Sequence, residues 1–365
     1  MQPPTSRHPR RALCLSVAML PMLLGGCDMV VMNPTGDIAM QQRNLILLSL
    51  GLMLLIIVPV IALTVAFAWK YRRGNPNKDY DPEFHHSTTL ELVIWACPLA
   101  IITILGAVTW ASTHQLDPFR PLERIAPGKP IPAGTKPLNV QVVAMDWKWL
   151  FIYPDLGVAT VNELALPVDV PVRFSITSTD QFNTFSAPTL AGMIYAMPTM
   201  RSELNAVLNK TGDSWGYSGN YTGAGYSDMR FKLRGVTKAG FDSWIAEAKA
   251  KGTPLSTETY VALTKPTTKA PVVRYSSVQA GLFDRIVNAC AEPGKPCMID
   301  VMRRDMLAGK MHMGERPATC DDKDGKLAPK AAPKAAKAEP AAARDPKVSA
   351  TDTLLLPGAV RAERA

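Results

Sequence analysis

The sequence predicts a membrane protein with a two-helix transmembrane hairpin, an exported all-β sandwich and a small helical C-terminal extension. Three observations predict this fold class. A short basic loop joins two long apolar runs, which is typical of a membrane hairpin. After residue 114, short runs of β-branched and aromatic residues alternate with turn residues, which favours a sandwich. After residue 238, the spacing of the apolar residues becomes helical.

The N-terminus has the pattern of a bacterial export signal. Arg7, Arg10 and Arg11 precede an apolar run at residues 12–24, which is too short to span a bilayer. The next residues, Leu-Gly-Gly-Cys, resemble the lipobox, in which the cysteine is acylated and begins the mature chain. We therefore expect residues 1–26 to be a lipoprotein signal peptide and Cys27 to carry a lipid anchor. The alternative is an ordinary signal peptide with an incidental cysteine.

Residues 45–69 and 90–112 are the two expected transmembrane helices, because each is apolar and long enough to cross a bilayer. Lys70, Arg72, Arg73 and Lys78 lie in the loop between them. Basic loops stay in the cytoplasm, so the outer ends of the hairpin face the periplasm. Residues 27–113 are thus expected to hold the lipidated N-terminus and the hairpin. We expect the cell inner membrane as the location, with both termini of the mature chain in the periplasm.

Glu91 is the only ionisable residue inside the limits of these two runs. An intramembrane carboxylate can belong to a proton path. We favour a position at the cytoplasmic interface, where Glu91 caps or orients the second helix. His85 and His86 precede it, and a histidine pair can ligate a metal. No neighbouring residue completes such a site, so we interpret both as solvated loop residues.

Residues 114–237 are expected to form the exported sandwich, after a proline-rich lead-in at residues 114–137. Residues 138–153 alternate and are rich in β-branched and aromatic side chains, which predicts strand structure. Pro167 and Pro171 are expected at strand edges. Further short strands are predicted at residues 163–166, 168–177, 184–185, 194–197, 203–209 and 229–233.

Residues 238–320 are expected to form the helical extension. Residues 238–251 predict a helix with Phe241, Trp244 and Ile245 as its apolar group, stopped by Gly252. Residues 256–264 and 278–290 predict two more helices. Residues 321–365 are dominated by Ala, Lys, Pro and Glu without apolar periodicity, which predicts a disordered tail.

The cysteines fall into separate groups. Cys14 leaves with the signal peptide, and Cys97 lies in an apolar run. Cys290, Cys297 and Cys320 are expected in an exported region, where disulfides can form. At most one pair can form among three, and Cys290 with Cys297 is the nearest choice. The spacing alone leaves this pairing open.

Several motifs together resemble one known family. The second apolar run contains HSTTLELVIWACP, in which His86, Leu90, Glu91, Trp95 and Pro98 carry the resemblance. The sandwich contains MDWKWLFIYPD, NELALPVDVPVRF and DQFNTFSAPTLAGMIYAMP. A hairpin and sandwich with these motifs, over roughly residues 27–320, resemble subunit II of the haem–copper respiratory oxidases. The resemblance implies a cupredoxin-like fold for residues 114–237.

Copper-bearing members of that family have a late loop of pattern Gly-x-Cys-x-Glu-x-Cys-Gly-x-x-His-Ser-x-Met. Residues 216–229, GYSGNYTGAGYSDM, fit this frame without a gap. Hydroxyl and amide groups do not replace thiolate and imidazole as ligands of soft copper ions, and one thioether cannot hold two coppers. The resemblance therefore implies a domain that has lost its dinuclear copper site. The lost ligand positions are Asn183, Ser218, Asn220, Thr222 and Tyr226, and Met229 is retained.

The lost ligands make the chain similar to the quinol branch of the family, the bo-type (cytochrome o) ubiquinol oxidases. In that branch a membrane quinol donates electrons directly to haem in subunit I. Residues 114–281 carry 17 Lys and Arg against 13 Asp and Glu. A docking surface for basic cytochrome c would instead be acidic. Trp147 and Trp149 belong to the family's aromatic strand, and without copper we interpret them as core or interface residues.

The resemblance implies subunit II of a proton-pumping oxidase that oxidises ubiquinol and reduces oxygen to water. No cofactor and no catalytic residue are expected in this chain, and haems and one copper are expected in the partner subunit I. The expected partners are subunit I, further small membrane subunits, ubiquinol as substrate of the complex, and membrane lipid, without nucleic acid. The candidate interface residues are Glu91, Trp95, Trp147 and Trp149.

Two other interpretations stay open. One is a copper-containing cytochrome c oxidase subunit II, and the other is a non-enzymatic cupredoxin-like lipoprotein. A rival metal hypothesis concerns a methionine-rich stretch, because thioethers and a histidine can bind Cu(I). Its first three methionines equally describe one apolar face of a helix, which we favour. The stretch contains Met298, Met302, Met306, Met311, His312 and Met313.

Overall fold

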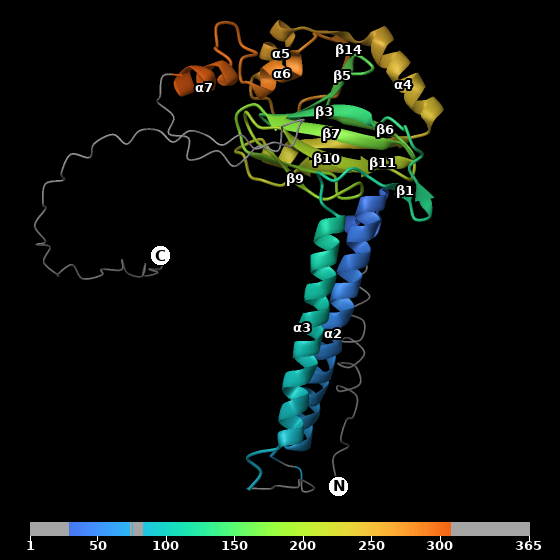
Figure 1. The fold of residues 1–365 in the computed structure, drawn as a ribbon, viewed down its shortest axis with the longest axis vertical. Helices are drawn as coiled ribbons and strands as arrows, with labels where there is room; N and C mark the ends of the chain where they lie inside the picture. Colours follow the sequence, from blue (N-terminus) through green and yellow to red (C-terminus); the bar gives the residue numbers. More distant parts are fainter. Residues whose placement is uncertain (1–28, 74, 76–82, 308–365) are drawn as a thin grey trace, which may run out of the picture. The chain divides into compact units, whose positions relative to one another are not determined.

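The computed structural model describes residues 29–73, 75 and 83–307. Two long helices, α2 (Asp37–Lys70) and α3 (Thr88–Gln115), run side by side (Figure 1). Both are long and apolar enough to cross a membrane, judged by length and composition. They contain the predicted apolar runs, and α2 begins eight residues earlier with a more polar segment. A short 3-10 helix, η1 (Val30–Met32), precedes them.

The larger sheet has seven strands. Near its centre, β3 (Leu138–Met145) and β4 (Lys148–Tyr153) form an antiparallel hairpin, and β3 also pairs in parallel with β7 (Pro171–Ser178). In spatial order the strands are β10 (Ser202–Val207), β7 (Pro171–Ser178), β3 (Leu138–Met145), β4 (Lys148–Tyr153), β5 (Val158–Val161), β14 (Val273–Val278) and β13 (Thr253–Leu255).

The smaller sheet has five strands and faces the larger one across the main core. In spatial order its strands are β6 (Glu163–Pro167), β12 (Arg230–Val236), β11 (Gly212–Ser218), β8 (Asn183–Ser186) and β9 (Ile194–Ala196). A separate two-stranded ribbon, β1 (Arg124–Ala126) with β2 (Lys129–Pro130), follows α3. The predicted β-sandwich is therefore confirmed, and Pro167 and Pro171 lie at strand ends as expected.

An aromatic cluster fills the space between the two sheets. Trp149 and Phe151 from β4 meet Phe185 from β8 and Phe231 from β12. The Phe185 and Phe231 rings stack with centroids 5.3 Å apart, and Trp149 meets both edge-on. Burial of each large aromatic side chain contributes about 2–3 kcal/mol, so this cluster is a main source of sandwich stability. Gly216 is required here, because a Cβ at this position would lie 1.9 Å from Cζ of Phe231.

The predicted strand structure at residues 138–153 is two strands and a turn, rather than one strand. The chain reverses at Asp146 and Trp147, and Trp147 adopts a positive φ of 63°. Strand β4 is buried at every position, because each of its faces meets a different core. Trp149 and Phe151 enter the core between the sheets, whereas Leu150 and Ile152 enter a second core on the outer face.

The C-terminal extension is not purely helical, which corrects the prediction for residues 238–320. Its strand β14 pairs with β5 and so extends the seven-stranded sheet of the sandwich. The predicted helix at 278–290 is shorter, and the strands β13 and β14 of the extension were not predicted. Outside the extension, strands β1, β2, β5 and β11 were not predicted either. The helices of the extension are α4 (Lys238–Lys251), α5 (Thr257–Thr264), α6 (Leu282–Val287) and α7 (Met298–Leu307).

The extension packs directly on the sandwich (Figure 1). Helix α4 has the predicted bounds, and its Phe241, Trp244 and Ile245 are buried in the main core. Tyr260 of α5 and Phe283 of α6 cover the outer face of the seven-stranded sheet, within the second core. The middle of that sheet is therefore covered on both faces, which explains why β4 and β5 are buried at every position.

A buried carboxylate ties the extension to the sandwich. Glu163, on β6, accepts hydrogen bonds from Nε and Nη2 of Arg274 on β14 at 2.8 and 3.2 Å. Arg234 Nη1 and Trp244 Nε1 donate to the same carboxylate. Burial alone would raise the pKa of Glu163, but Arg274 and Arg234 outweigh this effect and leave the pKa lowered. The carboxylate therefore stays ionised as the centre of this contact.

Candidate functional site

The positions that match the family's copper ligands come together at one end of the sandwich. Asn183 begins β8 and Ser218 ends β11, and these two strands pair directly. Asn220, Thr222 and Tyr226 lie on the loop that leads from β11 to β12. The structure thus brings Asn183 close to the later positions, which begin at Ser218, at the same end of the sandwich.

Asn183 and Ser218 bind each other. Ser218 Oγ donates to Oδ1 of Asn183 at 3.1 Å, and the side chains are 2% and 1% exposed. Nδ2 of Asn183 donates to the carbonyl of Gln181 at 3.1 Å. Each polar atom is satisfied by a neutral partner, as buried polar groups require. The pair therefore stabilises the junction of β8 and β11.

The other predicted positions have separate contacts. Asn220 Oδ1 accepts a hydrogen bond from Thr184 Oγ1 at 2.8 Å, which holds the start of the loop against β8. Met229 is 1% exposed and packs in the main core. Tyr226 contacts the ring of Tyr221, with centroids 5.7 Å apart. Met229 therefore contributes to packing between the sheets.

This donor set does not fit a dinuclear copper centre. Such a centre needs bridging thiolates and imidazoles, which soft copper ions prefer. Asn183 and Ser218 offer an amide and a hydroxyl, and their polar atoms are already bonded to each other. Only Met229 offers a soft donor, and it is enclosed by the core. Electron transfer through copper therefore has no support from the residues at these positions.

The glycine-rich loop holds the indole of Trp147. Trp147 Nε1 donates to the carbonyl of Thr222 at 3.1 Å. Gly225 lies so close that a Cβ there would be 2.3 Å from Cδ2 of the indole, and Gly223 lies nearby with φ of +105°. Larger residues would displace the ring. Trp147 is therefore half-buried against the loop. Trp149 is fully buried in the core, so the two tryptophans have different environments.

A buried lysine beside this loop was not predicted. Lys148 is 1% exposed, and its Nζ donates to the carbonyl of Lys265 at 2.7 Å. Burial lowers the pKa of Lys148, whereas the charge of Asp146 opposes this effect. Burial and the charge of Asp180 raise the pKa of Asp146, and Lys148 opposes them. The signal in the sequence that could have identified this buried charge is a single lysine in the otherwise apolar segment 148–153.

Glu91 lies in the first turn of α3, beside the predicted histidines. His86 Nε2 is 3.3 Å from Oε2 of Glu91, and Ser87 Oγ accepts from the backbone N–H of Leu90. A carboxylate near a helix N-terminus is favoured by the helix dipole. Trp95 is 77% exposed on the same helix, one turn after Glu91. His85 contacts the carbonyl of Glu83, so the histidines do not converge on one point.

The methionine-rich stretch is partly described. Met298, Met302 and Met306 lie on α7, in which no residue is buried. Met311, His312 and Met313 lie outside the described residues, as do Cys14, Cys27 and Cys320. Among the described residues, no group of three or more His, Cys, Asp or Glu could hold a metal ion. Cys97 is exposed on α3 with a free thiol.

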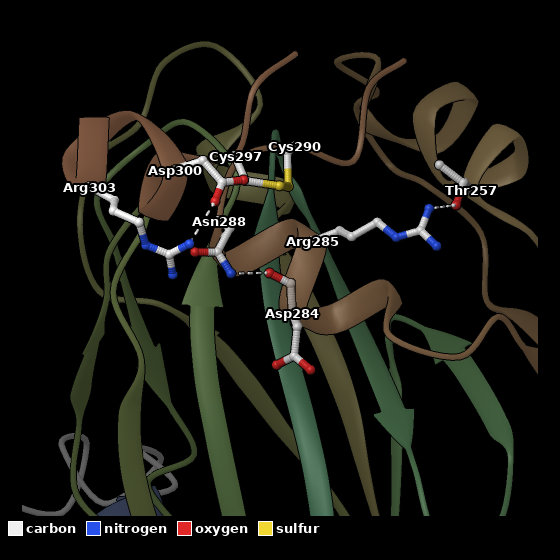
Figure 2. Close-up of a disulfide and its surroundings, with 8 residues drawn as sticks. All are labelled: Thr257, Asp284, Arg285, Asn288, Cys290, Cys297, Asp300 and Arg303. Atoms are coloured by element: carbon white, nitrogen blue, oxygen red, sulfur yellow. Dashed lines mark hydrogen bonds and ion pairs between the residues drawn. A yellow bond between two sulfur atoms is a disulfide. The ribbon is translucent and has the colours of Figure 1, made fainter. Parts of the chain in front are cut away.

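Cys290 and Cys297 form a disulfide, as Figure 2 shows. The bond joins the segment after α6 to the start of α7. Asn288 Nδ2 donates to the carbonyl of Asp284 at 2.8 Å, and Arg285 Nη1 donates to Thr257 of α5 (Figure 2). The nearest pairing considered from the sequence is therefore the one that the structure contains.

Comparisons with known proteins relate most of this chain to one family. A family model described as COX Aromatic Rich Motif matches residues 249–294, which lie in the extension. A protein from Pseudomonas aeruginosa named cytochrome bo(3) ubiquinol oxidase subunit 2 is 47% identical over 266 residues, covering 73% of this chain and 78% of that protein. A protein from Acetobacter aceti named ubiquinol oxidase subunit 2 is 42% identical over 266 residues, covering 73% and 84%.

Among solved structures, the periplasmic domain of subunit II of cytochrome oxidase from Bradyrhizobium japonicum is 26% identical to the matched part of this chain. The match covers 31% of this chain and 94% of that domain, with a TM-score of 0.30. That score is too low to support a structural comparison. The sequence relatives therefore carry the family relationship.

Proposed function

This chain belongs to the subunit 2 family of bo-type ubiquinol oxidases, and we propose that it serves such a complex without a redox centre of its own. The complex oxidises ubiquinol, reduces oxygen to water and moves protons outward. The haems and copper of the reaction belong to the partner subunit I. No residue of this chain is assigned to the chemical step.

The hydrogen bond between Ser218 and Asn183 is the observation that carries this proposal. The two residues occupy a thiolate position and an imidazole position of the copper-bearing branch. Their neutral groups satisfy each other, so the site serves as a structural junction. A quinol dissolved in the membrane can deliver electrons to haem in subunit I without a copper relay outside the membrane.

The hairpin α2–α3 packs against subunit I, and the sandwich covers the outer side of the complex. The exposure of Trp95 and of the apolar faces of both helices supports this arrangement. Glu91 and Trp95 contact subunit I or the membrane interface, whereas Trp147 and Trp149 stabilise the sandwich. Further small membrane subunits complete the assembly. The domains of this chain end at residues 26, 113, 237 and 320, as the sequence predicts.

The inner membrane is the location, with the loop between α2 and α3 in the cytoplasm. The disulfide between Cys290 and Cys297 supports a periplasmic extension, because disulfides persist in oxidising compartments. Cys27 carries the lipid anchor. Labelling with a radioactive fatty acid tests this point, and a Cys27→Ala chain should lose the label while the wild type retains it.

Oxygen consumption by the purified complex tests the function. We expect rapid uptake with ubiquinol and none with reduced cytochrome c. Metal analysis of the separated chain should find no copper, and about two coppers per chain would establish a cytochrome c oxidase subunit instead. A tagged chain that never copurifies with haem and a large membrane subunit would indicate a lipoprotein outside the oxidase.

A further inference from the structure

A polar cavity lies where the two long helices meet the sandwich. Its volume is about 400 Å³, and it is lined by the first turns of α2, the residues after α3, and Leu204 and Asn205 of β10. A second hollow of about 520 Å³ reaches down to Leu45 and Ser112. The two hollows share Gln42 and residues 116–118 as lining. The two hollows therefore adjoin, and together they are called the groove.

The groove lies at the height of a lipid headgroup if α2 and α3 span the membrane, as proposed above. Leu45 begins the uncharged part of α2, and Asp37 lies eight residues before it. At 1.5 Å per residue, that separation is about 12 Å. The polar layer on each side of a bilayer is about 5–8 Å thick. The lower end of the groove thus reaches the hydrocarbon edge, and the cavity extends through the polar layer.

The ion pair between Asp37 and Arg124 forms part of the cavity wall and makes this wall rigid. Asp37 is 1% exposed and accepts from Nε and Nη2 of Arg124 at 2.9 and 3.2 Å. Gln41 Nε2 donates to the same carboxylate at 2.7 Å. These contacts fix the first turn of α2 to strand β1. A ligand therefore meets a preformed wall, which reduces the entropy lost on binding.

Three other charged side chains, Asp117, Arg120 and Glu123, line the cavity and remain accessible to a ligand. Asp117 and Arg120 stand at the two ends of one turn, in which the Arg120 N–H donates to the Asp117 carbonyl at 3.1 Å. The Asp117 carboxylate accepts from the backbone N–H of Phe119 at 3.0 Å. Arg120 forms an exposed ion pair with Glu123, which a phosphate can replace at little cost. Opposite charges on one turn match a headgroup that carries both signs.

We propose that this groove binds a phospholipid whose headgroup contains a phosphate and a primary ammonium group, as in phosphatidylethanolamine. Arg120 contacts the phosphate, since guanidinium groups form strong charge-assisted hydrogen bonds with it. Asp117 contacts the ammonium group. The acyl chains leave the groove at Leu45 and Ser112. Leu45, Leu116 and Pro118 make much of the exit surface apolar, which favours a lipid over a soluble phosphate compound.

Native mass spectrometry of the complex, extracted in a mild detergent, tests the proposal. Arg120→Gln removes the phosphate contact, and Asp117→Asn removes the charge while keeping an oxygen acceptor for Phe119. The matched control is Arg303→Gln, because Arg303 forms an exposed pair with Asp300 at the same i,i+3 spacing on α7. Wild type and control should retain one phosphatidylethanolamine that Arg120→Gln holds about tenfold more weakly.

Re-addition of defined lipids to the delipidated complex separates the two contacts. Wild type should prefer phosphatidylethanolamine to phosphatidylglycerol, and Asp117→Asn should lose this preference. Equal lipid retention by all four proteins would overturn the proposal. A photo-crosslinker at position 120 that captures another subunit rather than lipid would also overturn it. Ubiquinol-dependent oxygen uptake, measured on the same samples, reports separately on the proposed function.

Discussion

Ser218 Oγ donates a hydrogen bond to Oδ1 of Asn183 across 3.1 Å, and both side chains are buried. Ser218→Ala would leave that amide oxygen without this donor, at a cost of about 2 kcal/mol in the free energy of unfolding. Thermal or denaturant unfolding of the full chain measures the loss. Ser227→Ala, at an exposed position of the same loop, is the control and should have little effect. Equal stability of the two variants would show that the pair is dispensable.

The close contact between Gly225 and Trp147 provides a second prediction for this region. Gly225→Ala should displace the indole and lower the free energy of unfolding by about 2 kcal/mol, because an added Cβ would overlap the ring. Near-ultraviolet circular dichroism and unfolding curves measure both effects. Ala224→Ser changes the neighbouring exposed residue of the loop and should leave both signals unaltered. An unaltered tryptophan signal in Gly225→Ala would contradict the described packing.

Glu163 should make stability depend on pH. Its pKa is lowered in the folded chain, so its contribution is present above the ordinary carboxyl pKa and is lost as pH falls through the lowered value. Glu163→Gln should cost about 3 kcal/mol at neutral pH, because Arg274 and Arg234 lose a buried partner. The variant should also have a flatter stability profile in acid, measured by unfolding at a series of pH values.

Glu247→Gln is the matched control for Glu163. Glu247 Oε2 accepts from Nη1 of the same Arg274 at 3.0 Å, but this carboxylate is exposed. Surface ion pairs contribute little, so the control should lose less stability than Glu163→Gln. A greater loss in the control would place the important contact outside the buried carboxylate.

The disulfide should hold α7 near α6. Replacing Cys290 and Cys297 with serine opens a loop of sequence separation 7, which lowers stability by roughly 2 kcal/mol in the chain-entropy description. Trypsin should then cleave faster at Arg303 and Arg304, as limited proteolysis with mass spectrometry would measure. Cys97→Ser, on α3, should leave the cleavage rate unchanged. A rate that is equal in all three proteins would mean that α7 is held by other contacts.

Local sequence patterns predicted most of the helices and many of the strands, but they did not predict which of these pair or pack together. Helix α4 was predicted with its observed bounds, because its apolar spacing and the stop at Gly252 lie within one segment; the structure adds a side-chain cap from Thr237. The pattern of residues 138–153 predicts continuous strand structure, since both arms of the hairpin carry similar apolar residues. Its turn depends on the positive φ of Trp147, which the residue type does not favour.

The extension was the least predictable region. Strand β14 is short, and its Tyr275 becomes buried only when α5 and α6 cover the sheet. Lys148 likewise looks like a surface residue in sequence, yet its position in the hairpin buries it against the carbonyl of Lys265. The pairing of β14 with β5 and the contact of Lys148 with Lys265 each join segments more than a hundred residues apart. Such contacts leave no local periodicity.

By itself, the sequence determined the two apolar helices and the amide and hydroxyl groups, rather than imidazole and thiolate, at Asn183 and Ser218. Helix length, hydropathy and donor chemistry are properties of the residues themselves. Only the tertiary structure decided that those two side chains bond to each other, that the glycine-rich loop encloses Trp147, and that Glu163 meets Arg274. The reason is physical: sheet pairing and core packing join residues by the path of the whole chain, as the separation of 111 residues in the last pair shows.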